Sequence, residues 1–355
     1  MKKKKNIRNL LIIISLLIII ILTTGLVLGY NLMFKANFQT PNVKEVFFIH
    51  KNDNFSTLLD TLLAKKYLKN RKSFENYAKF RNLENENKLK VGCYAIKSGM
   101  TNREFFNMVC NGWQTPIHLK FNNIRFNTQL ASKIAKQVDI DSVEMINLLN
   151  DSAFLAQYGF TPQTAIALFI PNTYEVYWTI SAEQLFDRME KEYKKFWNTE
   201  RLAKAAKIPL TPIETAILAS IVEEESNKKQ EKPIIAGLYI NRLHKEMKLE
   251  ADPTSRYAAG DFAATQITNK HTKIKSPYNT YDNFGLPPGP IRMPSVEGID
   301  AVLNYAKTNY IFMCAKPELN GEHNFAATLA EHNKNAAAYH QAYKEWKKAQ
   351  KLVDN

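Results

Sequence analysis

An uninterrupted run of 21 residues without a charge, residues 10–30, constrains the fold of this chain more than any other feature. A run of this length is enough to cross a bilayer as one helix. Residues 2–5 are all lysine, and lysines gather on the cytoplasmic side of membrane helices. The sequence therefore predicts a basic cytoplasmic tail at 1–9, a transmembrane helix at 10–30 in the cytoplasmic (inner) membrane, and the remaining chain outside the cytoplasm. A cleaved signal peptide is the alternative; it is disfavoured because the run is longer than a usual signal core and lacks a small-x-small cleavage site.

The rest of the 355-residue chain is long enough for about two domains. Residues 31–42 are few and polar, so we predict a tether. Residues 43–115 show the pattern strand, helix, helix, strand, helix without a cluster of catalytic residue types, which predicts a small structural or binding module. Residues 116–355 combine helices, short strands and loops rich in Pro, Gly, Asn and Tyr, which predicts a larger domain and an α+β fold class for the chain.

The composition argues against several kinds of site. Three cysteines, Cys93, Cys110 and Cys314, and seven scattered histidines show no metal-ligand spacing, so we expect no metal and no cofactor. A Cys93–Cys110 disulfide is left open. The net charge is +14, of which residues 2–5 and Arg8 supply five, and a basic surface suits anionic lipid or an anionic polymer. The sequence contains no nucleic-acid-binding motif, so nucleic acid is not an expected partner.

One helix, predicted at 212–227, stands at the centre of the larger domain. Thr211 is a suitable N-cap, Pro212 fits the first helical position, and Glu214 completes a capping box. The residues that follow are apolar on more than one face, which predicts a buried helix. The helix ends in three successive glutamates, which need solvent or a cleft because burial of a charge is unfavourable.

These three glutamates occupy different faces of the helix. Glu225 follows apolar residues three, four and seven positions earlier, so its side chain lies on the apolar face, whereas Glu223 and Glu224 lie over Ser220. A carboxyl group among apolar side chains holds its proton more tightly, which suits a general acid near neutral pH. The alternative is a solvated helix end, because runs of glutamate are common there.

Motifs around and after this helix occur in a recognisable order. They are ASIVEEES at 219–226, NRL at 241–243, DPT at 252–254 with Tyr257, YNTY at 278–281, GLPPGPI at 285–291, HNF at 323–325 and EHN at 331–333. In this order they resemble the endolytic murein transglycosylases of the MltG or YceG-like family, and the resemblance extends over the whole chain. It implies an N-terminal anchor, a LysM-like module at about 43–115 and a YceG-like catalytic domain at 116–355.

The resemblance also implies an activity. Members of the family are lytic transglycosylases, lyases that cut MurNAc–GlcNAc β-1,4 bonds inside nascent peptidoglycan strands and so limit strand elongation during cell wall biogenesis. One acid protonates the leaving oxygen and then takes the proton of the sugar's own 6-hydroxyl, which closes a 1,6-anhydro ring without water. The family's catalytic acid falls on Glu225. The implied partners are glycan strands and the membrane, with peptidoglycan synthases or division proteins as further candidates.

Polar groups on the same motifs are candidates for binding substrate or for orienting the acid. They are Glu223, Ser226, Asn241, Thr254, Tyr257, Asn279, Thr280, Tyr281 and His323. Asp252 is the nearest candidate for the second carboxylate of a hydrolase, although its place before Pro253 favours a role in fixing the loop. Two alternatives stay open: a lysozyme-like hydrolase, which the product terminus distinguishes, and a catalytically silent peptidoglycan-binding scaffold, which the chemistry of Glu225 distinguishes.

Overall fold

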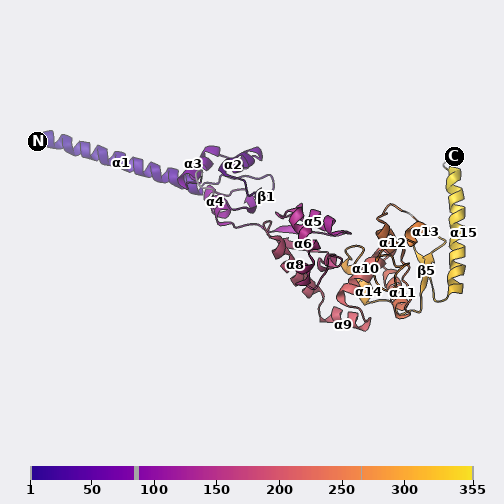
Figure 1. Cartoon of the computed structure of the whole chain (residues 1–355). Coiled ribbons are helices and arrows are strands. Elements are labelled where there is room, and N and C mark those ends of the chain that lie inside the picture. Colours follow the sequence, from indigo (N-terminus) through magenta and orange to yellow (C-terminus); the bar gives the residue numbers. More distant parts are fainter. Residues whose placement is uncertain (1, 84–87, 265, 354–355) are drawn as a thin grey trace. The chain divides into compact units, whose positions relative to one another are not determined.

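The structure is a computed structural model that describes residues 2–83, 88–264 and 266–353. The chain forms two compact units: unit 1 comprises Met1–His118 with Glu175–Thr179, and unit 2 comprises Leu119–Tyr174 with Ile180–Asn355. Helices and strands are both present (Figure 1), so the expected mixture of the two is confirmed.

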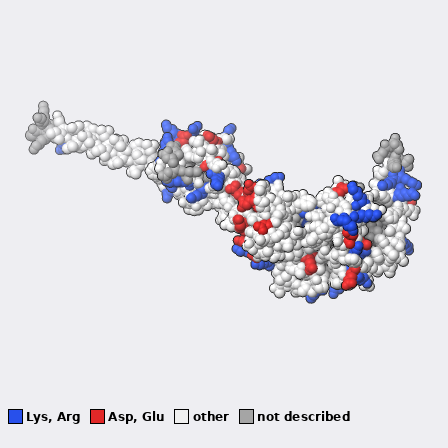
Figure 2. Space-filling model, viewed as in Figure 1, with Lys and Arg blue, Asp and Glu red and all other residues white. Residues whose placement is uncertain are grey.

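Unit 1 begins with one long helix, α1 (Lys2–Phe34), which extends beyond the predicted 10–30 at both ends. Its stretch Asn6–Phe34 is apolar and is not buried within the chain, so by length and composition it is a candidate membrane span. Figure 2 shows the part of this helix that follows its grey N-terminal end as an almost uncharged rod. Most of its apolar side chains are exposed, and a bilayer is a solvent that would cover them.

The segment 31–42 differs from the predicted tether. Its first residues belong to α1, and Phe38 is fully buried in the core of unit 1. Asn37 is buried as well; its side chain donates to the Asn70 carbonyl oxygen at 3.0 Å and to Asn102 Oδ1 at 2.8 Å. The polar composition was misleading because these amides satisfy one another inside the protein, as buried polar groups must.

The other elements of unit 1 form a small α/β body. They are β1 (Lys44–Ile49), α2 (Phe55–Ala64), α3 (Arg71–Phe80), β2 (Gly92–Lys97) and α4 (Asn102–Asn111). β1 pairs antiparallel with β2, and their core-facing side chains pack with those of the three helices. The predicted order of strands and helices is confirmed, whereas the likeness to a LysM module stays a prediction. All three cysteines are free, so the Cys93–Cys110 disulfide is not formed.

Unit 2 is mainly helical. Along the chain its elements, with the border strands β3 and β4, are β3 (Ile117–Lys120), α5 (Asn127–Ala135), α6 (Ser142–Asn150), α7 (Ser152–Ala156), the 3₁₀ turn η1 (Ala165–Leu168), β4 (Thr173–Val176), α8 (Ala182–Phe196), α9 (Thr199–Lys207), α10 (Pro212–Glu225), α11 (Lys232–His244), α12 (Asp252–Ala259), α13 (Asn269–Thr272), α14 (Val296–Leu303), β5 (Phe312–Ala315), β6 (His323–Ala326) and α15 (Leu329–Val353). β3 pairs with β4, and β5 pairs antiparallel with β6.

The core of unit 2 is built around α10. Its N-terminus has the predicted capping box: Glu214 N donates to Thr211 Oγ1 and Thr211 N donates to the Glu214 carboxylate. Residues 215–222 are all buried, because α9, α11, α12 and α14 surround the helix. Gly237 on α11 allows the segment after α14 to approach closely, since a Cβ at this position would lie 2.2 Å from the Ala306 carbonyl oxygen. The buried helix predicted from the sequence is therefore present, and its C-terminal end delivers the three glutamates to the surface of this core.

Candidate active site

Glu225, the last residue of α10, has a partner that the sequence did not indicate. Tyr239 on α11 is 1% exposed, and its hydroxyl donates to Glu225 Oε1 at 2.5 Å. Burial raises the pKa of Glu225 to about 7; the Tyr239 hydrogen bond opposes this rise, and the nearby Asp252 carboxylate adds to it. An overall rise in the pKa is the change expected from the apolar neighbours of Glu225 in the sequence. Near neutral pH this group is therefore able both to give and to take a proton.

The same side chain opens into a cleft of about 610 Å³. The walls come from α11, α12, the β5–β6 hairpin and the first half of α15, which Figure 1 shows beside β5. A volume in this range suits a group of the size of a sugar unit. The polar side chains that line the cleft with Glu225 are Tyr239, Arg242, Glu250, Asp252, Tyr281, His323, His332, Asn333 and Tyr339.

The other two glutamates of the run are engaged elsewhere. The Glu224 side chain is 8% exposed and forms ion pairs with Arg125 at 2.8 Å and Arg292 at 2.6 Å. Glu223 Oε2 accepts a hydrogen bond of 2.9 Å from Ser295 N, at the N-cap of α14. Neither side chain lines the cleft described above, so the three acids differ in environment as well as in helix face.

A fourth acid, Glu231, lies just before α11 and is 5% exposed. Its carboxylate accepts from Ser226 Oγ at 2.8 Å, from His323 N at 2.7 Å and lies 3.1 Å from His323 Nδ1. Burial would raise the pKa of Glu231, but the hydrogen bonds from His323 and Ser226 outweigh it and hold the pKa below its usual value. Ser226, predicted as a site residue, therefore connects the turn after Glu225 to His323, which lines the cleft.

Asp252 and Tyr281 meet on the wall of the cleft. The Tyr281 hydroxyl donates to Asp252 Oδ1 at 2.7 Å. Asp252 is exposed and begins α12, whereas burial and this carboxylate raise the pKa of Tyr281. The predicted loop-fixing contact of Asp252 is thus present, and the same carboxylate also faces the cleft.

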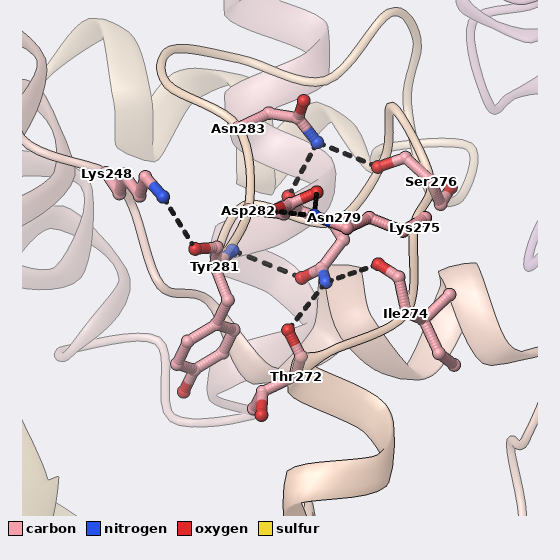
Figure 3. A network of polar contacts seen from close by, with 9 residues as sticks. All are labelled: Lys248, Thr272, Ile274, Lys275, Ser276, Asn279, Tyr281, Asp282 and Asn283. Atoms are coloured by element: carbon pink, nitrogen blue, oxygen red, sulfur yellow. Dashed lines mark hydrogen bonds and ion pairs between the residues drawn. The ribbon is translucent and has the colours of Figure 1, made fainter.

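Asn279 organises the loop that carries Tyr281. Its Nδ2 donates to the carbonyl oxygens of Thr272 and Ile274 at 2.9 and 2.8 Å, and its Oδ1 accepts from Tyr281 N at 3.1 Å. Figure 3 shows these contacts converging on one side chain, with Lys248 bound to the Tyr281 carbonyl oxygen. Asn279 is fully buried, so its amide shapes the loop and does not reach the cleft.

Four more of the predicted residues also lie outside the lining of this cleft. Thr254 and Thr280 are buried with their hydroxyls 2.8 Å apart. Asn241 Nδ2 donates to two carbonyl oxygens of the segment 308–310 at 2.7 and 2.9 Å. Tyr257 lies on a separate cavity of about 350 Å³. Of the predicted residues, the structure brings Glu225, Tyr281 and His323 together in the cleft.

Two residues that contact the cleft-lining side chains were not revealed by the sequence pattern. Tyr239, which lines the cleft, is one of many apolar or aromatic positions on α11. Glu231, which contacts His323, lies in the charged stretch KKQEK, which resembles a solvated surface. Their positions relative to Glu225 depend on how α10, α11 and the β5–β6 hairpin pack. Among the described residues, no group of three or more His, Cys, Asp or Glu side chains is arranged to hold a metal ion.

Comparisons by sequence and by structure both relate this chain to YceG-like proteins. The sequence model of the YceG-like family matches residues 47–338. The chain is 29% identical over 307 residues to a protein of Bacillus subtilis named endolytic murein transglycosylase, covering 82% of this chain and 83% of that protein. It is 30% identical over 177 residues to a Streptococcus pneumoniae protein of the same name, covering 48% of this chain and 31% of the relative. A crystal structure of a YceG-like protein from Listeria monocytogenes superposes with a TM-score of 0.54 at 28% identity, over 82% of this chain and 98% of that one.

Proposed function

This chain belongs to the YceG-like family, and from that premise we propose that it is a lytic transglycosylase that cleaves MurNAc–GlcNAc β-1,4 bonds inside nascent peptidoglycan strands. The observation that carries the proposal is Glu225: its carboxyl group is placed by a buried helix at a cleft, and burial raises its pKa to about 7. A general acid with a pKa near the working pH transfers protons most effectively.

The reaction needs one proton delivered and one removed. Protonated Glu225 gives its proton to the O4 oxygen of the leaving sugar as the bond from that oxygen to C1 breaks. The O6 oxygen of the sugar that keeps C1 bonds to this carbon, and its hydroxyl proton passes to a base in the cleft. The hydrogen bond from Tyr239 stabilises the Glu225 carboxylate that the first transfer leaves behind.

A lysozyme-like hydrolase is the second candidate because Asp252 also lines the cleft. A hydrolase uses its second carboxylate either as a nucleophile or to activate water. The Tyr281 hydroxyl occupies one oxygen of Asp252, which favours the positioning role. The two reactions leave different ends, 1,6-anhydroMurNAc for the lyase and a reducing sugar for the hydrolase.

The activity test uses the full-length protein in detergent, uncrosslinked glycan strands and mass spectrometry of the ends formed. Glu225→Gln retains an acceptor for Tyr239 but cannot act as an acid, so we expect anhydro ends to fall by at least about 10²–10⁴-fold while the Tm is at least as high as that of wild type. Glu223→Gln is the matched control, because that carboxylate binds Ser295 N. Near-normal yield from Glu225→Gln, or loss of activity in Glu223→Gln with an unchanged melt, would show that the acid is assigned wrongly. Reducing ends from the wild-type protein would favour the hydrolase, and no cleavage at all would favour the silent scaffold.

We also propose that α1 anchors the protein in the cytoplasmic membrane, with the rest of unit 1 and unit 2 outside the cytoplasm. The apolar, unburied stretch of α1 and the lysines before it support this orientation. Protease added to spheroplasts should then remove the units while the cell membrane remains closed. Protection of both units, in cells whose other outward-facing proteins are digested, would contradict the proposed orientation.

Unit 1 is proposed to hold glycan without cleaving it, as a LysM-like module would. A groove of about 650 Å³ in this unit is lined by Trp113, which is 62% exposed, and by Lys44 and Lys97. An exposed aromatic ring next to cations suits a sugar ring that carries acidic substituents. Trp113→Ala in the Glu225→Gln background should weaken sedimentation with glycan strands, with Tyr177→Ala as an exposed aromatic control. Equal binding by both variants would remove this role for the groove.

A further inference from the structure

His323 is hydrogen-bonded to Glu231 and lines the cleft that contains Glu225. Its backbone N–H donates to Glu231 Oε1 at 2.7 Å, and its Nδ1 lies 3.1 Å from Glu231 Oε2. Because a carboxylate only accepts hydrogen bonds, Nδ1 has to carry the hydrogen in this pair. In the neutral ring the free lone pair is then on Nε2, the nitrogen on the far side of the ring.

Glu231 is well suited to support a charge on this ring. It is buried, it accepts a further hydrogen bond from Ser226 Oγ, and these contacts hold it in its ionised form. A carboxylate behind an imidazole fixes the ring's tautomer and stabilises the imidazolium that forms when the other nitrogen takes a proton. The pair therefore has the arrangement of an oriented base.

His323 lines the same cleft as Glu225. The His323 side chain is 17% exposed and lines the cleft, and Nε2 has no hydrogen-bond partner within the described part of the chain. We propose that His323, held by Glu231, is the base that takes the proton of the substrate's 6-hydroxyl during anhydro-ring closure. This inference rests on the proposed lytic transglycosylase function and assigns its second proton transfer.

Glu225 as the acid and His323 as the base are each supported by a neighbouring side chain, Tyr239 and Glu231 respectively. When Glu225 gives up its proton, Tyr239 donates to the new carboxylate and stabilises it. When Nε2 takes the O6 proton, the imidazolium is paired with the Glu231 carboxylate. One proton leaves Glu225 for O4 and one leaves O6 for His323, so the net charge of the cleft is unchanged during the step. After product release, solvent returns a proton to Glu225 and removes one from His323.

The alternative is that Glu225 itself takes the O6 proton, as the single acid of the family mechanism does, while His323 only fastens the β5–β6 hairpin to the turn before α11. Two isosteric substitutions separate the alternatives. In His323→Asn the amide nitrogen takes the place of Nδ1 and retains the contact with Glu231, while nothing replaces Nε2. In His323→Gln the amide lies near the place of Nε2, where it can hydrogen-bond a hydroxyl but cannot accept its proton.

The experiment measures kcat and KM for anhydro-end formation by the full-length protein in detergent. We expect His323→Asn and His323→Gln each to lower kcat by about 10²–10⁴-fold with a wild-type thermal melt. Glu231→Gln should lower kcat by at least about tenfold, because the imidazolium loses its counter-charge. The matched control is His271→Asn, since His271 pairs with Asp261 at 3.2 Å outside the cleft; its kcat should stay within about threefold of wild type.

Two results would overturn the assignment. A kcat within tenfold of wild type in His323→Asn would show that only the Nδ1 contact matters, and near-normal kcat in His323→Gln would show that a hydrogen bond suffices without proton transfer. Wild-type protein that forms no anhydro ends would instead remove the proposed function, and the role of His323 with it. The outcome in the wild-type protein thus distinguishes the two failures.

Discussion

Replacing Glu225 should stabilise the protein, and the gain should depend on pH. In the folded protein burial raises the pKa of this group from its ordinary 4.5 to about 7. Between these two pH values the folded state binds more protons than the unfolded state, so stability falls as pH rises through this window and the full penalty is present above about pH 7. Glu225→Gln removes the titration but preserves an acceptor for the Tyr239 hydroxyl.

The rise in pKa corresponds to about 3 kcal/mol. Because the side chain is only half-buried at the edge of the cleft, solvent screening reduces the expected effect to about 2–3 kcal/mol. For a unit of this size that is roughly a 4–12 °C higher Tm at pH 8 and almost no difference at pH 4.5. Most substitutions of buried residues lower stability, whereas this one is expected to raise it, which makes the prediction specific.

The assay is thermal and urea unfolding of wild type and Glu225→Gln at pH 4.5, 6 and 8, with Glu345→Gln as control. Glu345 is exposed on α15, so its substitution should leave Tm nearly unchanged at every pH. A Tm difference for Glu225→Gln that is the same at pH 4.5 and pH 8, or a variant less stable than wild type at pH 8, would refute the reasoning. Either result would mean that burial does not raise the pKa of Glu225 in the folded protein.

Three further changes test the surroundings of the cleft. Glu224→Gln leaves two arginines without their buried counter-charge and should lower stability by about 3 kcal/mol, seen as a lower urea midpoint; an unchanged midpoint would mean that these ion pairs contribute nothing. Asn279→Ala leaves several buried backbone groups without partners and should cost at least about 2 kcal/mol, with KM rising because Tyr281 loses its support; a normal melt would contradict the network of Figure 3. Gly237→Ala places a methyl group against a backbone carbonyl and should lower stability by about 1–3 kcal/mol by calorimetry, whereas a neutral effect would mean that α11 and its neighbour separate easily.

The sequence was sufficient to predict α10 and its burial because every signal for this helix is local. A capping box, a proline at the first turn and an apolar pattern on all faces are read within a few residues, and the helical period alone separated Glu225 from its two neighbours. What each glutamate contacts could not be predicted in the same way. The partners of Glu224 and Glu223 come from segments 68 to 99 residues away, and their positions depend on packing between elements.

The candidate substrate residues show a second limit of sequence reasoning. Asn279, Thr254 and Thr280 have polar side chains on a family motif, yet all three are buried and bind backbone or one another. A long loop that packs inside a protein needs side chains to satisfy its own carbonyl and N–H groups. The same residue types would serve to bind a sugar, so composition alone does not separate the two uses. The segment 31–42 was misjudged for a related reason, since its amides are paired within unit 1.

The direct continuation of α1 into unit 1 has a geometric consequence. The Asn102 side chain donates to the Leu32 carbonyl oxygen, and Arg103 lies over the Phe34 ring, so the last turn of α1 is fastened to the body of unit 1. An α-helix advances about 1.5 Å and rotates about 100° per residue. With α1 seated in a bilayer, one residue inserted before this last turn would swing unit 1 by about 100° around the membrane normal, and four would bring it back to within about 40°. The number of residues in α1 therefore sets the rotation of unit 1 around the membrane normal as well as its distance from the lipid. Insertions there should impair the function of the protein in cells with the period of a helix.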